Sequence, residues 1–313
     1  MPDWKILLTD GLEEKGQAIL RAAANVDECS GISPAELIKI VGQYDAMIVR
    51  GRTTVNADVL AAATNLKVLG RAGVGVDNID LAAAQSRGLT VLNSPTATTI
   101  AVAEHTLALM LALVRSVPRA DAAIKSGQWI KKQLVGVELH GKTLGIIGVG
   151  RIGGAVGQRA AAFGMQVLGN DPLLGDNEIR QRGAEPVPLT ELYTRSDFIS
   201  LHVPITPDTR GMIDGQSMGH MKRGVRLICT ARGGLIDETA LLAALESGQA
   251  AGAALDVFAN EPPGLTALVA HPNVIATPHI SAQTTEAQSR AAADIASEVL
   301  AALRCEPLRW KIV

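Results

Sequence analysis

The chain has 313 residues, more than a single hydrophobic core usually supports, so its length predicts two domains. Its composition, 47% hydrophobic and 19% charged, is typical of a folded globular protein and excludes a largely disordered one. The formal net charge of -2 provides no general attraction for polyanions, so neither a nucleic acid nor a membrane surface is an expected partner.

The cysteines and the N-terminal segment indicate the compartment. Cys29, Cys229 and Cys305 are odd in number and far apart, a pattern that favours free thiols over a disulfide framework or a zinc site. The first residues, MPDWKILLTDGLEE, have only a short apolar run with acids close behind it, unlike a signal peptide. We expect a cytoplasmic protein without a bound metal.

Short apolar runs alternate with helical patterns in the first third of the chain, which is typical of parallel strands joined by crossover helices. Strands are expected at residues 5–9, 44–50 and 67–73, with an amphipathic helix at 33–43. Residues 90–92 end this first series of strands.

A long apolar helix is expected at residues 99–116, after several candidate N-caps in SPTATT. It carries Glu104 and His105 and is too short to cross a bilayer without burying them, so it is predicted to be a core helix. It is also apolar over more of its circumference than one domain would cover. That excess predicts a contact with a second copy of the chain, a homodimer.

A second series of apolar runs follows this helix. Strands are expected at 143–148, 165–170, 197–203, 225–231, 251–257 and 273–277. Six strands are what a dinucleotide-binding domain needs. Residues 284–305 are helical again, and their apolar face predicts a return to the first domain. We therefore expect an α/β fold with two doubly wound parallel sheets, a Rossmann domain at 97–281 inserted in a flavodoxin-like substrate domain at 1–96 and 282–313.

The segment LGIIGVGRIGGAV, residues 144–156, places three glycines between an expected strand and an expected helix. Gly148 permits a tight turn, Gly150 lets the backbone approach a pyrophosphate, and Gly153 lets the helix and strand pack closely. The helix N-terminus then offers free amides to the phosphates. The alternative is a simple turn in a chain with 31 glycines, and the strand and helix on either side favour the cofactor site.

Asp171 follows the last glycine of this motif by about 20 residues, the spacing expected of the acid that binds an adenosine ribose. A carboxylate there repels a 2′-phosphate, so NAD is expected rather than NADP. The alternative role is a turn, because Asp171 precedes Pro172.

Oxidation of an alcohol by a nicotinamide enzyme requires a base that titrates near neutral pH, and histidine is the natural candidate. The chain has six histidines. His279 stands out because it follows an expected strand directly, at the carboxyl end where open α/β sheets collect their ligands. Roles in helices, turns or packing account for the other five.

Five motifs together carry a resemblance to a known family. They are GRAGVGVDNID (70–80), GKTLGIIGVGRIG (141–153), TARGGLIDE (230–238), GAALDVFANEPP (252–263) and ATPHISAQTTEA (276–287). In this order they resemble the D-isomer-specific 2-hydroxyacid dehydrogenases, most closely the members that act on D-3-phosphoglycerate. The resemblance extends over nearly the whole chain. It implies an NAD-dependent enzyme that acts on a small 2-hydroxy or 2-keto acid.

The resemblance also implies the catalytic residues. Arg232 would hold the substrate carboxylate and polarise its carbonyl oxygen, since its forked donors match both oxygens. His279 would be the acid/base, and Glu261 the carboxylate that pairs with it and fixes its tautomer. The alternative for Arg232 and Glu261 is a surface ion pair, which their occurrence in family order with His279 disfavours.

Further cofactor-binding residues are implied in the same way. Asp256 would bind the nicotinamide carboxamide, and Arg151 and Ile152 would supply backbone donors to phosphate. The remaining residues expected beside the cofactor are Thr230, His202 and Pro204. We expect His202 to serve as a hydrogen-bonding residue rather than an acid.

The substrate residues are expected in the first domain. The amides of Val74 and Gly75 would bind the substrate carboxylate, and Arg50 and Arg71, at the ends of expected strands, would approach a phosphate. The alternative is that both arginines are structural or surface residues.

Two segments depart from the family pattern. Residues 95–99, PTATT, stand where an NGN-type turn is usual, and Ser281, Ala282 and Gln283 stand where GAST usually begins. The departures leave hydroxypyruvate, glyoxylate and sulfolactate as alternative substrates. An NAD-sensing corepressor-like binding protein is the alternative outside enzymes. No regulatory domain of the kind that longer members append is expected.

Overall fold

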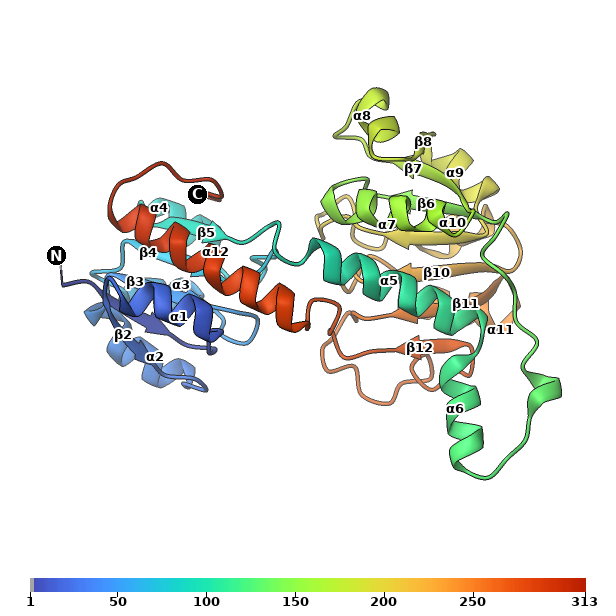
Figure 1. Ribbon diagram of the computed structural model, residues 1–313, viewed down its shortest axis with the longest axis horizontal. Helices are drawn as coiled ribbons and strands as arrows, with labels where there is room; N and C mark the ends of the chain where they lie inside the picture. The colour runs from blue at the N-terminus through green and yellow to red at the C-terminus, as the bar shows by residue number, and fades with distance from the viewer. Residues whose placement is uncertain (1–2) are drawn as a thin grey trace. The chain divides into compact units, whose positions relative to one another are not determined.

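The computed structural model describes residues 3–313, so Met1 and Pro2 of the expected substrate domain lie outside the described residues. The chain divides into two compact units (Figure 1). Unit 1 comprises Met1–Thr98 and Gln283–Val313, and unit 2 comprises Thr99–Ala282. The chain therefore leaves unit 1 once and returns to it with its last helix.

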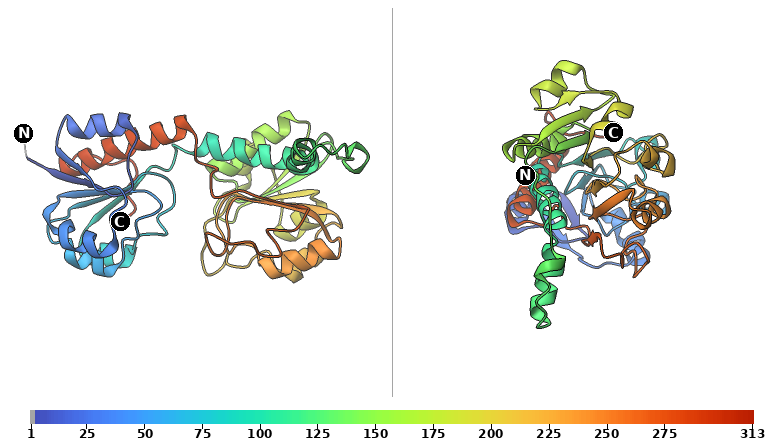
Figure 2. Two further views of the ribbon diagram at one scale, coloured as in Figure 1. Left: turned by 90° about the horizontal axis from the view of Figure 1, so that it is seen from below. Right: turned by 90° about the vertical axis from the view of Figure 1, so that its right-hand side faces the viewer.

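Unit 1 is built on a five-stranded parallel sheet in the order β2-β1-β3-β4-β5. Its strands are β1 (Lys5–Leu8), β2 (Asn25–Glu28), β3 (Ala46–Val49), β4 (Val68–Arg71) and β5 (Thr90–Asn93). Its helices are α1 (Glu14–Arg21), α2 (Pro34–Ile40), the 3-10 helix η1 (Val41–Gln43), α3 (Ala57–Ala62), α4 (Leu81–Ser86) and α12 (Thr285–Leu303). Helices α1 and α12 cover one face of the sheet, and α2, α3 and α4 cover the other (Figure 2).

Alternating side chains of the central strands supply both cores of unit 1. On β1, Leu7 packs with the α2–α4 layer while Ile6 and Leu8 pack with the α1–α12 layer. Helix α12 contributes Ile295 and Val299, which are fully buried on the second of these faces. The apolar face noted in residues 284–305 is thus packed on unit 1.

Unit 2 is built on a seven-stranded parallel sheet in the order β12-β11-β10-β9-β6-β7-β8. Its strands are β6 (Thr143–Ile147), β7 (Gln166–Asn170), β8 (Glu185–Pro186), β9 (Phe198–Leu201), β10 (Val225–Cys229), β11 (Ala250–Leu255) and β12 (Val274–Ala276). Its helices are α5 (Thr99–Val114), α6 (Val117–Lys125), η2 (Lys131–Gln133, 3-10), α7 (Arg151–Ala162), α8 (Asp176–Gln181), α9 (Leu189–Arg195), α10 (Gly215–Gly219) and α11 (Glu238–Glu246). The expected α/β class with two parallel doubly wound sheets is confirmed. The seventh strand, β8, has two residues and no apolar pattern, which is why six strands were expected.

The long helix expected at 99–116 is α5, and it ends at Val114. Ser116 has a φ of 49°, which breaks the helix before α6 begins. Eight of the 16 residues of α5 are buried, and the helix packs on α7 and on β10 and β11. Within residues 3–313, no single helix is long and apolar enough to span a bilayer; only α5 and α6 taken together pass that test, and they are bent by 63° at their junction.

Candidate active site

The glycine motif follows β6 and begins α7. A Cβ added to Gly153 would lie 2.0 Å from the carbonyl oxygen of Gly148, so helix and strand pack as closely as the sequence predicted. Gly148 has a φ of 89°, which favours glycine in the turn. At Gly150, which caps α7, an added Cβ would meet no atom within 4 Å. No protein atom therefore blocks the approach of a phosphate to Gly150, beside the amides of Arg151 and Ile152 in the first helical turn.

The glycine motif lies at a topological switch point of the sheet. Strand β6 is bonded to β7 on one side and to β9 on the other, so the loops after β6 and β9 diverge at the carboxyl edge. The loop after β9 carries His202 and Pro204. The backbone N–H of His202, the first residue after β9, donates to the carbonyl of Ile147, the last residue of β6, at 2.8 Å.

His202 is a neutral hydrogen-bonding residue. Its Nε2 lies 2.8 Å from the Ser200 hydroxyl, and burial lowers its pKa to about 4. An imidazole with that pKa is not in the acidic imidazolium form near neutral pH, so His202 is poorly suited to acid catalysis.

Asp171 directly follows β7, and its carboxylate is held by two backbone amides. It accepts hydrogen bonds from the N–H of Val149 in the glycine loop (2.9 Å) and of Leu173 (3.0 Å). Arg182, which the sequence did not single out, donates to the Val149 carbonyl at 2.7 Å from the other side. Asp171 thus forms a turn and also fixes the glycine loop, while its role toward a ribose stays a prediction.

His279 and Glu261 form a hydrogen-bonded pair. Nδ1 of the imidazole lies 2.7 Å from Oε2 of Glu261, and Oε1 of the same carboxylate accepts from the Phe258 N–H at 3.1 Å. Both side chains are partly exposed, at 48% and 38%. Nε2 of His279 forms no hydrogen bond with any residue within 3–313, so this nitrogen is available to accept or donate a proton.

Asp256 holds the turn on which His279 lies. Its carboxylate is completely buried and accepts from the Thr277 hydroxyl (2.6 Å) and from the amides of Ile280 (2.9 Å) and Ser281 (2.8 Å). The bonded residues lie on both sides of His279 in the sequence. The φ of His279, 53°, lies in the left-handed region that non-glycine residues rarely adopt. The role of Asp256 toward the nicotinamide stays a prediction.

The ionisation of Asp256 depends on the same donors. Burial would raise its pKa, but hydrogen bonds from His105, from the Thr277 hydroxyl and from the amides of Ile280 and Ser281 outweigh it and lower the pKa to about 2. His105 on α5 lies 3.6 Å from the carboxylate. Sequence reasoning missed this role of His105, because only the fold brings α5 under the turn.

Arg232 lies in the loop after β10. Its Nη1 donates to the Ala231 carbonyl at 2.6 Å, and a Cβ added to the next residue, Gly233, would lie 1.7 Å from the Phe258 carbonyl oxygen. The Arg232 loop is therefore packed tightly on the loop that carries Glu261. Thr230 is buried beside it, with its hydroxyl 3.0 Å from that of Thr106.

The three loops that carry Arg232, Glu261 and His279 share one edge of the sheet. They follow β10, β11 and β12, which are adjacent parallel strands, and carboxyl ends of such strands meet at a common edge. Unit 2 by itself thus brings the three expected catalytic residues to one region.

In unit 1, Arg50 follows β3 and Arg71 ends β4, so both lie at the carboxyl edge of neighbouring strands. Val74 and Gly75 follow in the loop after β4, where the Val74 carbonyl accepts from the Asn93 side chain at 2.7 Å. The structure groups these four expected substrate residues at one edge of the unit 1 sheet.

Comparison with known proteins identifies the family. Residues 107–281, more than half of the chain, match the model described as "D-isomer specific 2-hydroxyacid dehydrogenase, NAD binding domain". The chain belongs to the D-isomer-specific 2-hydroxyacid dehydrogenase family. The expected family and the expected NAD-binding domain are both confirmed, and this is a family of NAD-dependent enzymes.

Among curated relatives of this chain, D-3-phosphoglycerate dehydrogenase of Synechocystis sp. is 45% identical over 305 residues, covering 97% of this chain and 55% of the relative. The protein of that name from Methanocaldococcus jannaschii is 47% identical over 303 residues, covering 96% of this chain and 58% of the relative. The chain thus spans about half the length of the curated relatives it matches.

Solved structures of similar length extend the comparison. The TT0316 protein from Thermus thermophilus is 37% identical, with a TM-score of 0.90 over 99% of this chain and 100% of that one. A glyoxylate reductase from Paecilomyes thermophila is 31% identical, with a TM-score of 0.92 over 100% and 99% of the two chains. The chain is also similar to D-lactate dehydrogenase from Escherichia coli, which is 27% identical, with a TM-score of 0.87 over 99% of this chain and 100% of that one.

No cluster of three or more His, Cys, Asp or Glu within residues 3–313 of the chain could hold a metal ion. Cys29, Cys229 and Cys305 are free thiols, and burial raises the pKa of Cys229 to about 11. That thiol is therefore inert at neutral pH.

Proposed function

We propose that this chain is an NAD-dependent dehydrogenase that transfers hydride between the nicotinamide ring and C2 of a D-2-hydroxy acid. The observation that carries the proposal is the His279–Glu261 pair, with a 2.7 Å contact, at the sheet edge that also carries Arg232. An NAD-binding protein without turnover has no need of this set of residues, so they favour the enzyme over the corepressor-like alternative.

Bound NAD supplies the hydride acceptor when the alcohol is oxidised and, as NADH, the hydride donor in the reverse direction. The glycine loop and the amides of Arg151 and Ile152 bind its pyrophosphate, and Asp171 binds the adenosine ribose. Asp256 orients the carboxamide, and Thr230, His202 and Pro204 line the cofactor. The open space beside Gly150 supports this arrangement.

The proton moves through His279. Glu261 accepts from Nδ1–H, so Nε2 is the basic nitrogen and removes the proton from the substrate hydroxyl. In the reverse direction the imidazolium returns that proton to the carbonyl oxygen, and the Glu261 carboxylate stabilises the imidazolium. Arg232 binds the substrate carboxylate and polarises the carbonyl through its forked donors.

The substrate we propose is D-3-phosphoglycerate, oxidised to 3-phosphohydroxypyruvate, a reaction of serine biosynthesis. Two curated relatives with 45% and 47% identity bear the name of that activity. Arg50 and Arg71 supply the charge that a phosphate requires, and the amides of Val74 and Gly75 bind the carboxylate. Hydroxypyruvate or glyoxylate reduction is the second candidate, favoured by the glyoxylate reductase with a TM-score of 0.92, and sulfolactate is a third.

The proposal includes a homodimer formed through α5 and the segment that follows it. This segment has four large apolar side chains that are exposed to solvent: Val117 (52%), Ile124 (59%), Trp129 (81%) and Val135 (89%). Sedimentation equilibrium of the wild type and Trp129→Ser tests the dimer, which the substitution is expected to weaken.

The free thiols support a reducing, cytoplasmic location.

The experiment that tests the function is NADH formation with D-3-phosphoglycerate, D-glycerate, D-lactate and sulfolactate, with product removal because alcohol oxidation lies uphill. We expect the highest rate with D-3-phosphoglycerate and loss of that rate in His279→Ala. Preference for an acid without phosphate would overturn the substrate, and NADH binding without turnover of any acid would overturn the enzyme.

A further inference from the structure

A small pocket lies within unit 2, at the edge of the sheet opposite the glycine motif. Lys142, Asp197 and Gly224 directly precede β6, β9 and β10, which are adjacent and parallel, so the amino ends of these strands meet at one edge. The pocket there has a volume of about 80 Å³. Its charged lining residues are four cations, Lys142, Lys222, Arg223 and Arg226, and one carboxylate, Asp197.

The carboxylate of Asp197 is already engaged by the protein. It accepts from the backbone N–H of Thr143 at 2.8 Å, and its Oδ1 lies 3.1 Å from Nζ of Lys222. Burial would raise the pKa of Asp197, but the bonds from Thr143 and Lys222 and the charges of Lys222 and Lys142 outweigh burial and lower it. Asp197 is therefore ionised, and a single negative charge faces four positive ones among the lining residues.

The other three cations keep donors that the protein does not use. Nζ of Lys142 forms no hydrogen bond or ion pair with a residue within 3–313. Nη2 of Arg223 donates to the Ser247 carbonyl at 3.0 Å, while its Nε and Nη1 donate to no residue in the described part of the chain. Nη1 of Arg226 lies 3.5 Å from the Gly224 carbonyl, and its Nε and Nη2 donate to no described residue.

Arg226 is held in place although it lacks a carboxylate partner. Its guanidinium carbon lies 5.6 Å from the centroid of the Phe198 ring, and that ring is completely buried. Burial lowers the pKa of Arg226 and the charge of Asp197 raises it, and a guanidinium remains charged at neutral pH. A half-buried cation in such surroundings is unfavourable unless an anion pairs with it.

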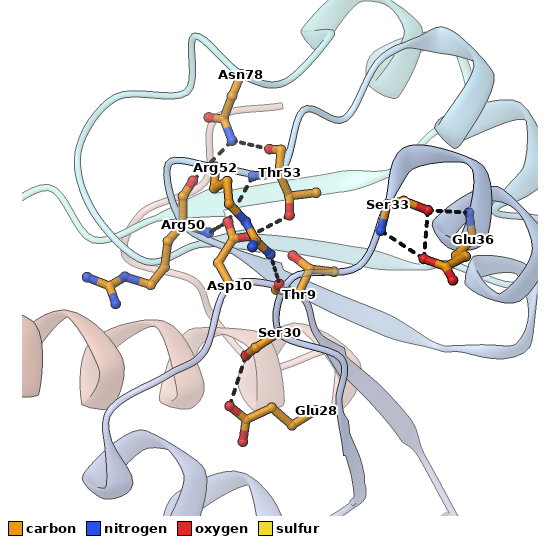
Figure 3. Close-up of polar contacts among 10 residues, drawn as sticks. All are labelled: Thr9, Asp10, Glu28, Ser30, Ser33, Glu36, Arg50, Arg52, Thr53 and Asn78. Atoms are coloured by element: carbon orange, nitrogen blue, oxygen red, sulfur yellow. Dashed lines mark hydrogen bonds and ion pairs between the residues drawn. The ribbon is translucent and has the colours of Figure 1, made fainter. Parts of the chain in front are cut away.

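Arg52 of unit 1 shows the contrasting arrangement. Its Nη2 donates to the Thr9 carbonyl at 3.0 Å and lies 3.5 Å from Oδ1 of Asp10, the carboxylate that follows β1 (Figure 3). Neither Arg223 nor Arg226 forms an ion pair with any residue within 3–313. The two guanidinium groups of the unit 2 pocket thus lack, among the described residues, the carboxylate that Arg52 has.

We propose that this pocket binds a tetrahedral oxyanion, either free phosphate or the phosphate group of a monoester, through Lys142, Arg223 and Arg226. A phosphate has several acceptor oxygens, so it accepts from two guanidinium groups and one ammonium group at the same time. The pocket has room for only a few water molecules, each of which takes about 30 Å³ in the liquid, so it fits one phosphate group and not a nucleotide. The site is separate from the proposed cofactor site, which lies at the carboxyl edge of the same sheet.

The binding test titrates inorganic phosphate into the full chain at constant ionic strength, with NAD at saturation so that the glycine loop is occupied. The backbone amide resonances of residues 222–226 report binding at this pocket. In Lys142→Gln/Arg223→Gln we expect the affinity reported by these amides to fall at least about tenfold. Lys39→Gln/Arg304→Gln removes the same charge from exposed positions of unit 1 and is the matched control, which should bind phosphate as the wild type does.

Thermal unfolding provides a second measurement and shows that the variants fold. Because a ligand that binds only the folded state stabilises it, phosphate should raise the Tm of the wild type and of the control more than that of Lys142→Gln/Arg223→Gln. No shift of the 222–226 amides in the wild type would overturn the site. An equal loss of affinity in both double variants would also overturn it, because that result shows general attraction by charge.

Glycerol 3-phosphate in the same titration distinguishes the two sources of the oxyanion. An affinity equal to that of inorganic phosphate supports a monoester as the occupant, and a preference for inorganic phosphate supports the free ion. Binding of neither overturns the proposal. None of these readouts requires turnover of a 2-hydroxy acid, so the oxyanion site and the proposed function can fail separately.

Discussion

Nδ1 of His279 lies 2.7 Å from Oε2 of Glu261, while the backbone of the same histidine has a φ of 53°. One residue therefore combines the proposed proton transfer with an uncommon backbone conformation. Residues in such conformations persist only where their surroundings hold them, and here the buried Asp256 does so through the two amides that follow His279.

Removal of the Glu261 charge should slow proton transfer without preventing cofactor binding. In Glu261→Gln we expect kcat to fall about 100-fold, because the amide no longer stabilises an imidazolium or secures its tautomer, and about 1000-fold in His279→Asn. Steady-state rates and NADH fluorescence titrations measure the two effects. A loss of NADH affinity that parallels the loss of rate would point to a structural role for the pair.

Asp256→Asn should destabilise unit 2 and misplace His279. The amide offers one acceptor oxygen where Asp256 offers two, so a backbone donor at Ile280 or Ser281 is left without an ionised acceptor. We expect a loss of about 2 kcal/mol in the free energy of unfolding, measured in urea, and a lower kcat. Asp208→Asn, at an exposed position of the same unit, is the control and should change stability little.

The stabilising effect of Asp256 should depend on pH. Its pKa is about 2 in the folded protein, below its ordinary value of 3.8, so its contribution is complete above pH 3.8 and is lost as the pH falls toward 2. The shift corresponds to about 2 kcal/mol. The difference in unfolding free energy between the wild type and Asp256→Asn should therefore shrink between about pH 5 and about pH 2.5. A constant difference over that range would show that the ionised form is not what stabilises the turn.

Two glycines of the cofactor loop should respond differently to alanine. Gly150→Ala meets no atom within 4 Å, so stability should change by less than about 1 kcal/mol while NADH affinity falls at least about tenfold. Gly153→Ala places a Cβ 2.0 Å from the Gly148 carbonyl oxygen and should lower Tm markedly. Thermal unfolding and NADH titration of both variants make the comparison. Unchanged NADH affinity in Gly150→Ala would contradict the pyrophosphate site.

The cofactor preference should depend on Asp171. In Asp171→Ser the repulsion of a 2′-phosphate is removed, and the ratio of kcat/KM for NADH to that for NADPH should fall about tenfold. Because Asp171 also accepts from the Val149 amide, NADH affinity itself should decrease. A ratio that stays the same would leave Asp171 as a turn residue only.

The elements that the sequence predicted best are those buried on both faces. Strands β6, β9 and β10 are mostly apolar and almost entirely buried, because helices cover both sides of a parallel sheet. The edge strand β2 (NVDE) was not predicted, since three of its four residues are exposed and it lacks an apolar run. Its place in the sheet comes from hydrogen bonds to β1, which no local pattern reveals.

The candidate site likewise combines residues that the sequence predicted with contacts that only the fold creates. The sequence by itself predicted the glycine loop and the spacing to Asp171, because turns and helix starts are local properties of the chain. It predicted Arg232 and Glu261 as partners of His279 only through the family resemblance. Only the tertiary structure decided that Asp256 supports the His279 turn and that Asp10 accepts a hydrogen bond from the backbone of Thr53, 43 residues away. Such contacts depend on which strands become neighbours, and strand order is a consequence of packing the whole sheet rather than of any segment within it.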